Sequence, residues 1–138
     1  MKIAIAALAD YAEALNNKLY ISGGLVTRVG KPAFPALLDL SLVLLLEQES
    51  DDPPKTELAI RLVDPDGNEV EPTIRGEIGV EPAPPDEGTP PLRSILPLTL
   101  RLPFPIDRPG RWAIRAAVDD APEYVLGIDV HPVDLPAG

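Results

Sequence analysis

Hydrophobic and polar positions alternate with a period of two along most of the chain, which is the pattern of β-strands that bury one face. The clearest run spans residues 37–46, where one phase is entirely leucine: Leu38, Leu40, Leu42, Leu44 and Leu46. The other phase holds Leu37, Asp39, Ser41, Val43 and Leu45. This run predicts a strand whose all-leucine phase faces a core.

The same alternation predicts about eight short strands. Apolar phases recur at 58–62, 74–80, 96–102, 112–118 and 126–130, and further strands are expected at 3–8 and 18–29. Little or no helix is expected; the one candidate is about one turn at 11–15, with a plain connection as the alternative. Short strands separated by regular turn signals are typical of all-β folds, so we expect an antiparallel β-sandwich, immunoglobulin-like or C2-like, with residues 1–138 as one domain.

Proline, glycine and aspartate mark the expected connections. Residues 64–67 predict a turn in which Gly67 has a positive φ, and residues 119–122 predict a hairpin loop. The strands at 37–46 and 58–63 are expected to be hairpin neighbours joined by the loop at 51–54. The proline-rich stretch 81–91 is expected to be a stiff crossover loop, although it also fits a P-x-x-P recognition pattern. Pro97 cannot donate a ladder hydrogen bond, so its strand is expected at a sheet edge.

Composition excludes several classes of function. The formal net charge is −10, from 22 acidic and 12 basic residues, which disfavours nucleic acid and anionic membranes as partners. There is no cysteine, so disulfides and thiolate chemistry are excluded. The apolar run at 3–9 is short and ends at Asp10, so we interpret it as a first strand and not as a secretion signal. We therefore expect a soluble cytoplasmic protein with no cofactor.

Three stretches carry a resemblance to a known family. They are residues 9–13 (Ala-Asp-Tyr-Ala-Glu), residues 17–24 (Asn-Lys-Leu-Tyr-Ile-Ser-Gly-Gly) and residues 109–112 (Pro-Gly-Arg-Trp). In these stretches the chain resembles an uncharacterised bacterial family known only as a domain of unknown function. The resemblance implies a β-sandwich and assigns no catalytic residues.

The acidic loops suggest one candidate metal site. Asp64 and Asp66 alternate before Gly67, as oxygen ligands do at the start of a calcium loop, but the distal glutamate and the flanking helices of an EF-hand are missing. A looser site would add Asp119 and Asp120, and also Asp51 and Asp52, if these loops met at one end of the sandwich. The alternative is an ordinary aspartate-rich turn.

Catalytic motifs are weak. His131 is the only histidine, and none of the four serines lies in a nucleophile-elbow sequence. Gly23, Gly24 and Gly30 lack the spacing of a phosphate loop and fit a bulge better. No pair of carboxylates stands out for glycosidase chemistry, so we expect no enzyme activity.

The outward phase of the strands holds a further candidate site. Val43, Leu45, Ala59 and Val63 are apolar where a solvated sheet face would be polar, and Ala113 and Ala117 repeat this feature. One hypothesis is a partner-binding face that supports a two-fold dimer; the other is cover by a loop of the same chain. The sequence therefore favours a non-enzymatic interaction or oligomerisation module, with a calcium- or small-ligand-binding sandwich as the alternative and a carboxylate hydrolase as a third possibility.

Overall fold

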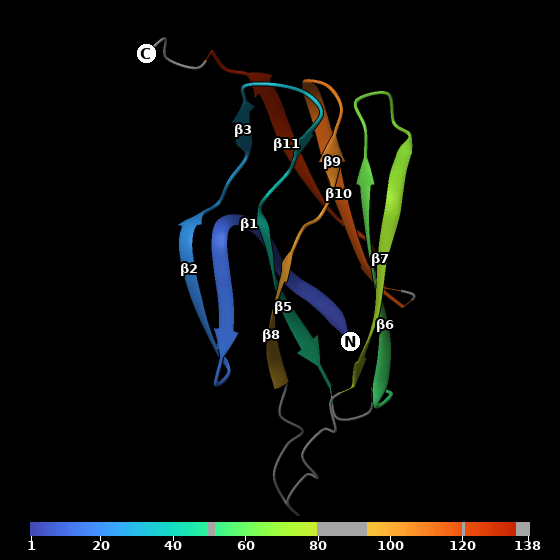
Figure 1. Cartoon of the computed structure of the whole chain (residues 1–138). Helices are drawn as coiled ribbons and strands as arrows, with labels where there is room; N and C mark the ends of the chain where they lie inside the picture. Colours follow the sequence, from blue (N-terminus) through green and yellow to red (C-terminus); the bar gives the residue numbers. More distant parts are fainter. Residues whose placement is uncertain (50–51, 80–93, 120, 135–138) are drawn as a thin grey trace, which may run out of the picture.

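The computed structural model describes residues 1–49, 52–79, 94–119 and 121–134, and within them every regular element is a β-strand. Two sheets pack face to face as a β-sandwich (Figure 1). No described segment forms a helix long and apolar enough to cross a membrane. The predicted all-β sandwich is therefore confirmed.

The first sheet has four strands in the spatial order β2-β1-β5-β8, all antiparallel. Their bounds are β1 Lys2–Leu15, β2 Lys18–Gly24, β5 Ser41–Gln48 and β8 Ser94–Arg101. Strand β8 lies at one edge of this sheet, as Pro97 predicts. Strand β2 forms the other edge.

The second sheet has five strands in the order β3-β11-β10-β6-β7. Their bounds are β3 Arg28–Lys31, β6 Lys55–Val63, β7 Glu69–Gly79, β10 Gly110–Val118 and β11 Tyr124–Pro132. A separate short pair joins β4 Ala36–Leu37 to β9 Pro105–Ile106. The three shortest strands, β3, β4 and β9, account for the eleven strands observed against about eight expected.

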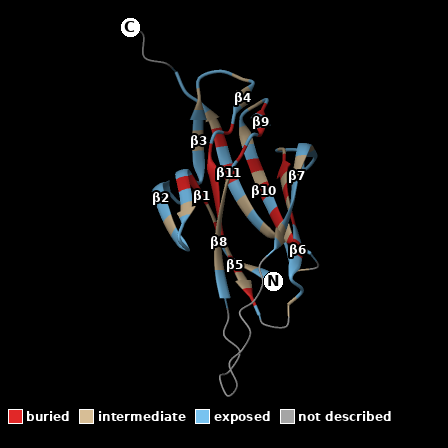
Figure 2. Cartoon of the chain, turned by 60° about the horizontal axis from the view of Figure 1, so that its bottom comes forward, coloured by how far each residue is buried: buried red, intermediate tan, exposed pale blue. Residues whose placement is uncertain are grey.

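The core lies between the sheets, where Figure 2 shows the buried residues. The leucine phase at 38–46 is buried as predicted, and Trp112 is buried against it. The Trp112 indole N–H donates to the carbonyl of Arg108, so its one polar atom is satisfied. The large apolar side chains of this core supply the main stabilising contribution in a chain without disulfides.

The structure differs from the sequence-based expectations in four details of the strand arrangement. Strands β5 and β6 lie in opposite sheets and are not hairpin neighbours. Residues 11–15 continue β1 instead of forming a helical turn, and the expected strand at 18–29 divides into β2 and β3, which belong to different sheets. Strand β3 pairs in parallel with β11, so the second sheet is mixed. Periodicity specifies which side of a strand is buried but not which strand lies beside it.

The expected connections at 64–67 and after β10 both agree with the structure. Gly67 has φ +88° in the β6–β7 turn, as predicted, and β10 pairs with β11 as a hairpin. The expected proline-rich loop at 81–91 lies outside the described residues.

Candidate protein-docking edge

The β1–β2 hairpin exposes the largest concentration of apolar side chains in the described chain. Six of the ten large hydrophobic residues that are exposed lie between residues 5 and 25. Five of them form what we call the hairpin edge: Tyr11, Leu15, Tyr20, Ile21 and Leu25. By the register of the hairpin, Tyr11, Leu15 and Tyr20 share one face and Ile21 lies on the other, so the exposed apolar groups flank the edge of β2 on both faces.

A tight turn creates this hairpin. Asn16 and Asn17 connect the strands with φ of 52° and 60°, and Leu15 pairs with Lys18 across them. Two consecutive positive φ values define a type I′ turn, whose twist matches that of the flanking strands. Asparagine tolerates this left-handed conformation better than most residues, which explains why the chain reverses here.

A bend in β1 turns the hairpin away from the line of the sheet (Figure 1). The first part of β1 pairs with β5 as far as Ala9, and the part from Ala9 onward pairs with β2. Behind the bend, Ala9, Ala12 and Val43 form a small second cluster with Leu19 packed against it. The hairpin is therefore held against the outer side of β5.

Arg101 fixes the bend from the end of β8. Its guanidinium donates hydrogen bonds to the carbonyl oxygens of Asp10 and Asp39, at 2.5 and 3.0 Å, and to Ser41 Oγ at 3.1 Å. It also donates to the Asp39 carboxylate, and this hydrogen bond holds the pKa of Asp39 below its usual value. One side chain thus connects three strands at the root of the hairpin.

The outer edge of β2 has no described partner strand. The turn hydrogen bond joins Lys18 to Leu15, so alternate residues of β2, namely Tyr20 and Ser22, also bond toward β1. Leu19 and Ile21 therefore direct their N–H and C=O groups away from the sheet, whereas Gly23, with φ +63°, leaves the extended conformation. Every residue of β2 except Leu19 is exposed (Figure 2).

The other three edge strands of the four-stranded and five-stranded sheets carry features that oppose pairing. Strand β7 contains Pro72 directly after Glu71, β8 contains Pro97, and β3 has four residues with a charge at each end. Proline, charge and short length are the usual protections of sheet edges. Strand β2 has seven residues, no proline and a single charge at its first position.

The partner-binding face expected at Val43, Leu45, Ala59 and Val63 is not one surface. The first two residues lie on β5 and the last two on β6, in opposite sheets. Val43 and Val63 are only 3% and 5% exposed. Val43 is covered by the chain itself, through the hairpin cluster.

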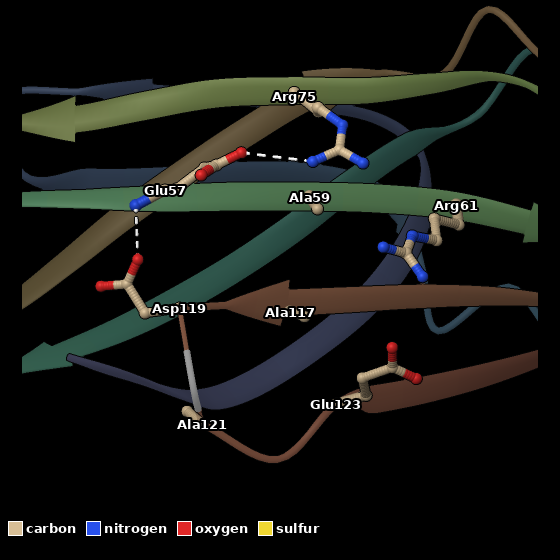
Figure 3. A pocket seen from close by; sticks show the side chains of 8 residues that line it. All are labelled: Glu57, Ala59, Arg61, Arg75, Ala117, Asp119, Ala121 and Glu123. Carbon is tan, nitrogen blue, oxygen red and sulfur yellow. Dashed lines mark hydrogen bonds and ion pairs between the residues drawn. The ribbon is translucent and has the colours of Figure 1, made fainter.

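Ala59 lies instead in a shallow hollow of about 330 Å³ on the outer face of the second sheet (Figure 3). Ala59 and Ala117 pair across β6 and β10 and form its floor. Its charged rim is internally paired: Arg75 contacts Glu57 at 3.4 Å, Arg61 contacts Glu69 at 3.2 Å and Arg115 approaches Glu123 at 4.0 Å. Such exposed, paired charges are ordinary on a solvated sheet face and indicate no particular ligand.

The structure does not bring the candidate calcium ligands together. Asp64 follows the last residue of β6, whereas the Asp119 N–H donates to the carbonyl of Glu57 near the first. At about 3.3 Å per residue the two aspartates are roughly 20 Å apart. Asp120 and Asp51 lie outside the described residues, and no described group of three or more histidines, aspartates or glutamates is arranged to hold a metal.

Arg108 forms ion pairs with both carboxylates of the β6–β7 turn. Its guanidinium lies 3.3 Å from Asp64 Oδ2 and 2.8 Å from Asp66 Oδ2. Asp64 Oδ1 accepts the backbone N–H groups of Asp66 and Asn68, both at 2.9 Å. Hydrogen bonding from the Asn68 N–H is the main reason that the pKa of Asp64 lies below its usual value. These carboxylates stabilise the turn.

The remaining candidates stay separate. His131 is half-buried on β11 beside Gly30 of β3, and its Nδ1 has no hydrogen-bond partner among the described residues. Asp52, near a third expected loop, pairs with the N-terminal ammonium group at 2.8 Å, which lowers the pKa of its carboxyl. Neither residue joins a cluster of the kind that catalysis needs.

Fold and site together define a β-sandwich with an unprotected apolar edge strand. Residues 4–131 match the model of a family of unknown function, DUF6941, and the chain belongs to that family. No curated protein and no solved structure matches the chain.

The sequence contained only part of this site. Residues 17–24 are one of the three stretches that resemble the family, but their apolar positions did not predict an open edge. The pattern at 18–29 looked like one strand, so the boundary at Gly24 and the exposure of Leu25, which is 81% exposed with φ +62°, were missed. The only available signal was the Asn16-Asn17 pair, a hairpin-turn dipeptide between two apolar runs.

Proposed function

We propose that this chain is a non-enzymatic protein-interaction module that docks another polypeptide through the hairpin edge. The observation that carries the proposal is the combination, on one strand, of unpaired backbone groups and exposed apolar side chains. An added strand would satisfy the outward N–H and C=O groups of Leu19 and Ile21, and its side chains would cover Tyr20 and Ile21. The proposal assigns no catalytic residues.

The charge of the molecule supports a protein partner over other classes. A net charge of −10 opposes association with nucleic acid or anionic lipid. The five residues of the hairpin edge are uncharged, with Glu13 and Lys18 of opposite sign beside them, so docking depends mainly on apolar burial and main-chain hydrogen bonds. A cytoplasmic location, expected from the sequence, remains part of the proposal.

Site-specific photocrosslinking tests the proposal. A benzophenone side chain is introduced at Tyr20 and, in a matched control, at Val125, because both residues are 54% exposed and they lie in different sheets. We expect a covalent product from position 20 and none from position 125 after irradiation in extracts of the source cells, with the attached protein identified by mass spectrometry. Absence of a product at position 20, or equal products at both positions, would contradict docking through this edge.

A further inference from the structure

We infer that the polypeptide docked on β2 is an extended segment with one arginine between two apolar residues, and that this arginine stacks on Tyr20 and pairs with Glu13. The inference rests on the proposed function and names the chemistry of the partner. It depends on two features of the hairpin: the open backbone of β2, and a carboxylate without a cation beside it.

Glu13 is an exposed carboxylate set in apolar surface. Tyr11 and Leu15 are its neighbours on the same face of β1, and Tyr20 lies directly opposite it on β2. The side chains of all three neighbours are exposed. An ion pair formed among apolar side chains is screened less by water and salt than one in open solvent. Glu13 is therefore a favourable place for a cationic group.

Glu13 receives no cation from the described part of its own chain. Most described carboxylates form ion pairs, but Glu13 forms none, and Lys18 on the same face is not within ion-pair distance of it. Nor does any described guanidinium or ammonium group lie over the ring of Tyr11 or Tyr20. The surface around Glu13 is therefore open to a cation from another molecule.

The backbone of β2 specifies where a side chain of the partner would lie. Leu19 and Ile21 direct their hydrogen-bonding groups outward, so an added antiparallel strand would bond to these two residues and place one residue opposite Tyr20. That position is a non-hydrogen-bonded pair, in which the Cα atoms are about 4.5 Å apart and the side chains are close. The pairing does not involve Gly23, where β2 leaves the extended conformation.

A side chain opposite Tyr20 meets Glu13 only if it is long. The partner residue, Tyr20 and Glu13 form one row across three strands, so the outer two backbones are two strand spacings, roughly 10 Å, apart. An arginine side chain extends across the Tyr20 ring toward the carboxylate, and arginine stacks on aromatic faces more often than lysine does. Arginine can thereby make both contacts at once.

The other side chains of β2 define the residues on either side of this arginine. Ile21 is exposed on the opposite face of the hairpin and Leu19 is partly buried there, so apolar residues suit the positions opposite them. Lys18 lies on the same face as Tyr20, and a basic residue opposite Lys18 would meet a like charge. The partner therefore carries its arginine singly, with an apolar residue on each side.

The charge of the whole molecule favours a basic segment over an acidic one. A net charge of −10 attracts a cationic partner over a distance, which speeds association and is weakened by salt. An acidic segment would be repelled by the same field. The long-range charge and the local row at Glu13 thus favour the same kind of partner.

A nuclear magnetic resonance titration of the whole isotope-labelled chain tests the inference. The probe is the blocked peptide Thr-Thr-Val-Arg-Val-Thr-Thr, and the matched probe replaces its arginine with citrulline, which has a similar shape but no charge. At up to millimolar concentration the arginine peptide should shift the backbone amide signals of Leu19 and Ile21. Its dissociation constant should be about threefold to tenfold lower than that of the citrulline peptide, because it adds one cation–π contact and one exposed ion pair.

Substitution of Glu13 separates the ion pair from strand addition in general. Glu13→Gln should raise the dissociation constant of the arginine peptide about threefold and leave that of the citrulline peptide unchanged. Glu71→Gln is the matched control, since Glu71 is exposed on β7 of the other sheet and also forms no ion pair with a described residue. The control should change neither constant.

Three outcomes would overturn the inference. They are equal affinity for the two peptides, equal effects of Glu13→Gln and Glu71→Gln on the arginine peptide, or no shift at Leu19 and Ile21 with either peptide. Equal affinity with shifts at these two residues would remove the role of arginine and leave docking on β2 in place. If no shift occurs, the photocrosslink at position 20 decides whether docking through the hairpin edge fails as well.

Discussion

At the scale of single residues, Asp64 and Arg108 show how the polar loops of this chain are stabilised internally. Asp64 closes the β6–β7 turn through two backbone N–H groups and pairs with Arg108. The Arg108 guanidinium lies 5.7 Å from the centre of the Trp112 ring. The backbone carbonyl of Arg108 accepts a hydrogen bond from the Trp112 indole N–H. Arg108 thereby links the β6–β7 turn to the start of β10 and to the buried Trp112.

The lowered pKa of Asp64 predicts a specific response to acid. A carboxyl whose pKa is lower in the folded state stabilises the fold above its unfolded pKa of about 4, and this contribution is lost as the pH falls through the folded pKa. Asp64→Asn keeps the acceptor oxygen for the turn but removes the charge that Arg108 contacts. The variant should therefore be less stable than the wild type at neutral pH, and the difference should shrink below about pH 4.

Urea denaturation at a series of pH values measures this difference. Asp134→Asn is the control, because it removes the same charge where no described hydrogen bond or ion pair exists. A stability difference for Asp64→Asn that stays constant down to the lowest pH would contradict the assigned role of the carboxylate.

At the scale of elements, the position of the β1–β2 hairpin depends on its turn and on the bend in β1 that places it against β5. The turn residues Asn16 and Asn17 are left-handed, and Arg101 holds the bend at Asp10. The second cluster around Val43 forms only when the hairpin is in place. The hairpin edge is thus a preorganised surface and not a loose extension.

Substitution at the turn should therefore weaken the hairpin. Asn17→Val places a β-branched residue at φ 60°, which should cost about 1 kcal/mol of unfolding free energy. Asn17→Gly is the matched control and should be as stable as the wild type or slightly more so, because glycine suits this position of a type I′ turn. Urea denaturation gives both values, and equal stability of the two variants would show that the turn does not hold this conformation in solution.

At the scale of the whole molecule, the order of strands decides which loops can cooperate. The acidic turn after β6 and the acidic loop after β10 lie at opposite ends of β6, because β6 and β10 are antiparallel neighbours. Among the described residues, the acidic side chains of these two loops are therefore not gathered into one ion site. Such a distribution favours solubility and opposes binding to polyanions.

This arrangement predicts that calcium does not stabilise the protein. A site occupied at a hundred times its dissociation constant would add about 2.7 kcal/mol and raise the melting temperature by several degrees. We expect millimolar calcium to leave the melting temperature the same as in an equal ionic strength of sodium chloride, measured by calorimetry. A calcium-specific rise that is lost in Asp64→Asn would restore the β6–β7 turn as a calcium site.

The sequence alone determined the strand class and the buried phases of this protein. The leucines at 38–46 alternate strictly, and a side chain on a strand points to one of two faces, so local periodicity was enough to identify the core face. Pro97 was likewise sufficient to predict an edge, because a missing N–H excludes a strand from the middle of a ladder.

Only the tertiary structure decided which strands are neighbours and which edges stay open. Val43 is apolar on the outward phase, and nothing in its own strand showed that the β1–β2 hairpin would fold back over it. The exposure of Tyr20 and Ile21 also depends on the absence of a described strand beyond β2, which is a property of the sheet order. Which strands pair depends on long-range packing between strands that have similar buried apolar faces. A local alternation of apolar and polar residues therefore does not predict the neighbours of a strand.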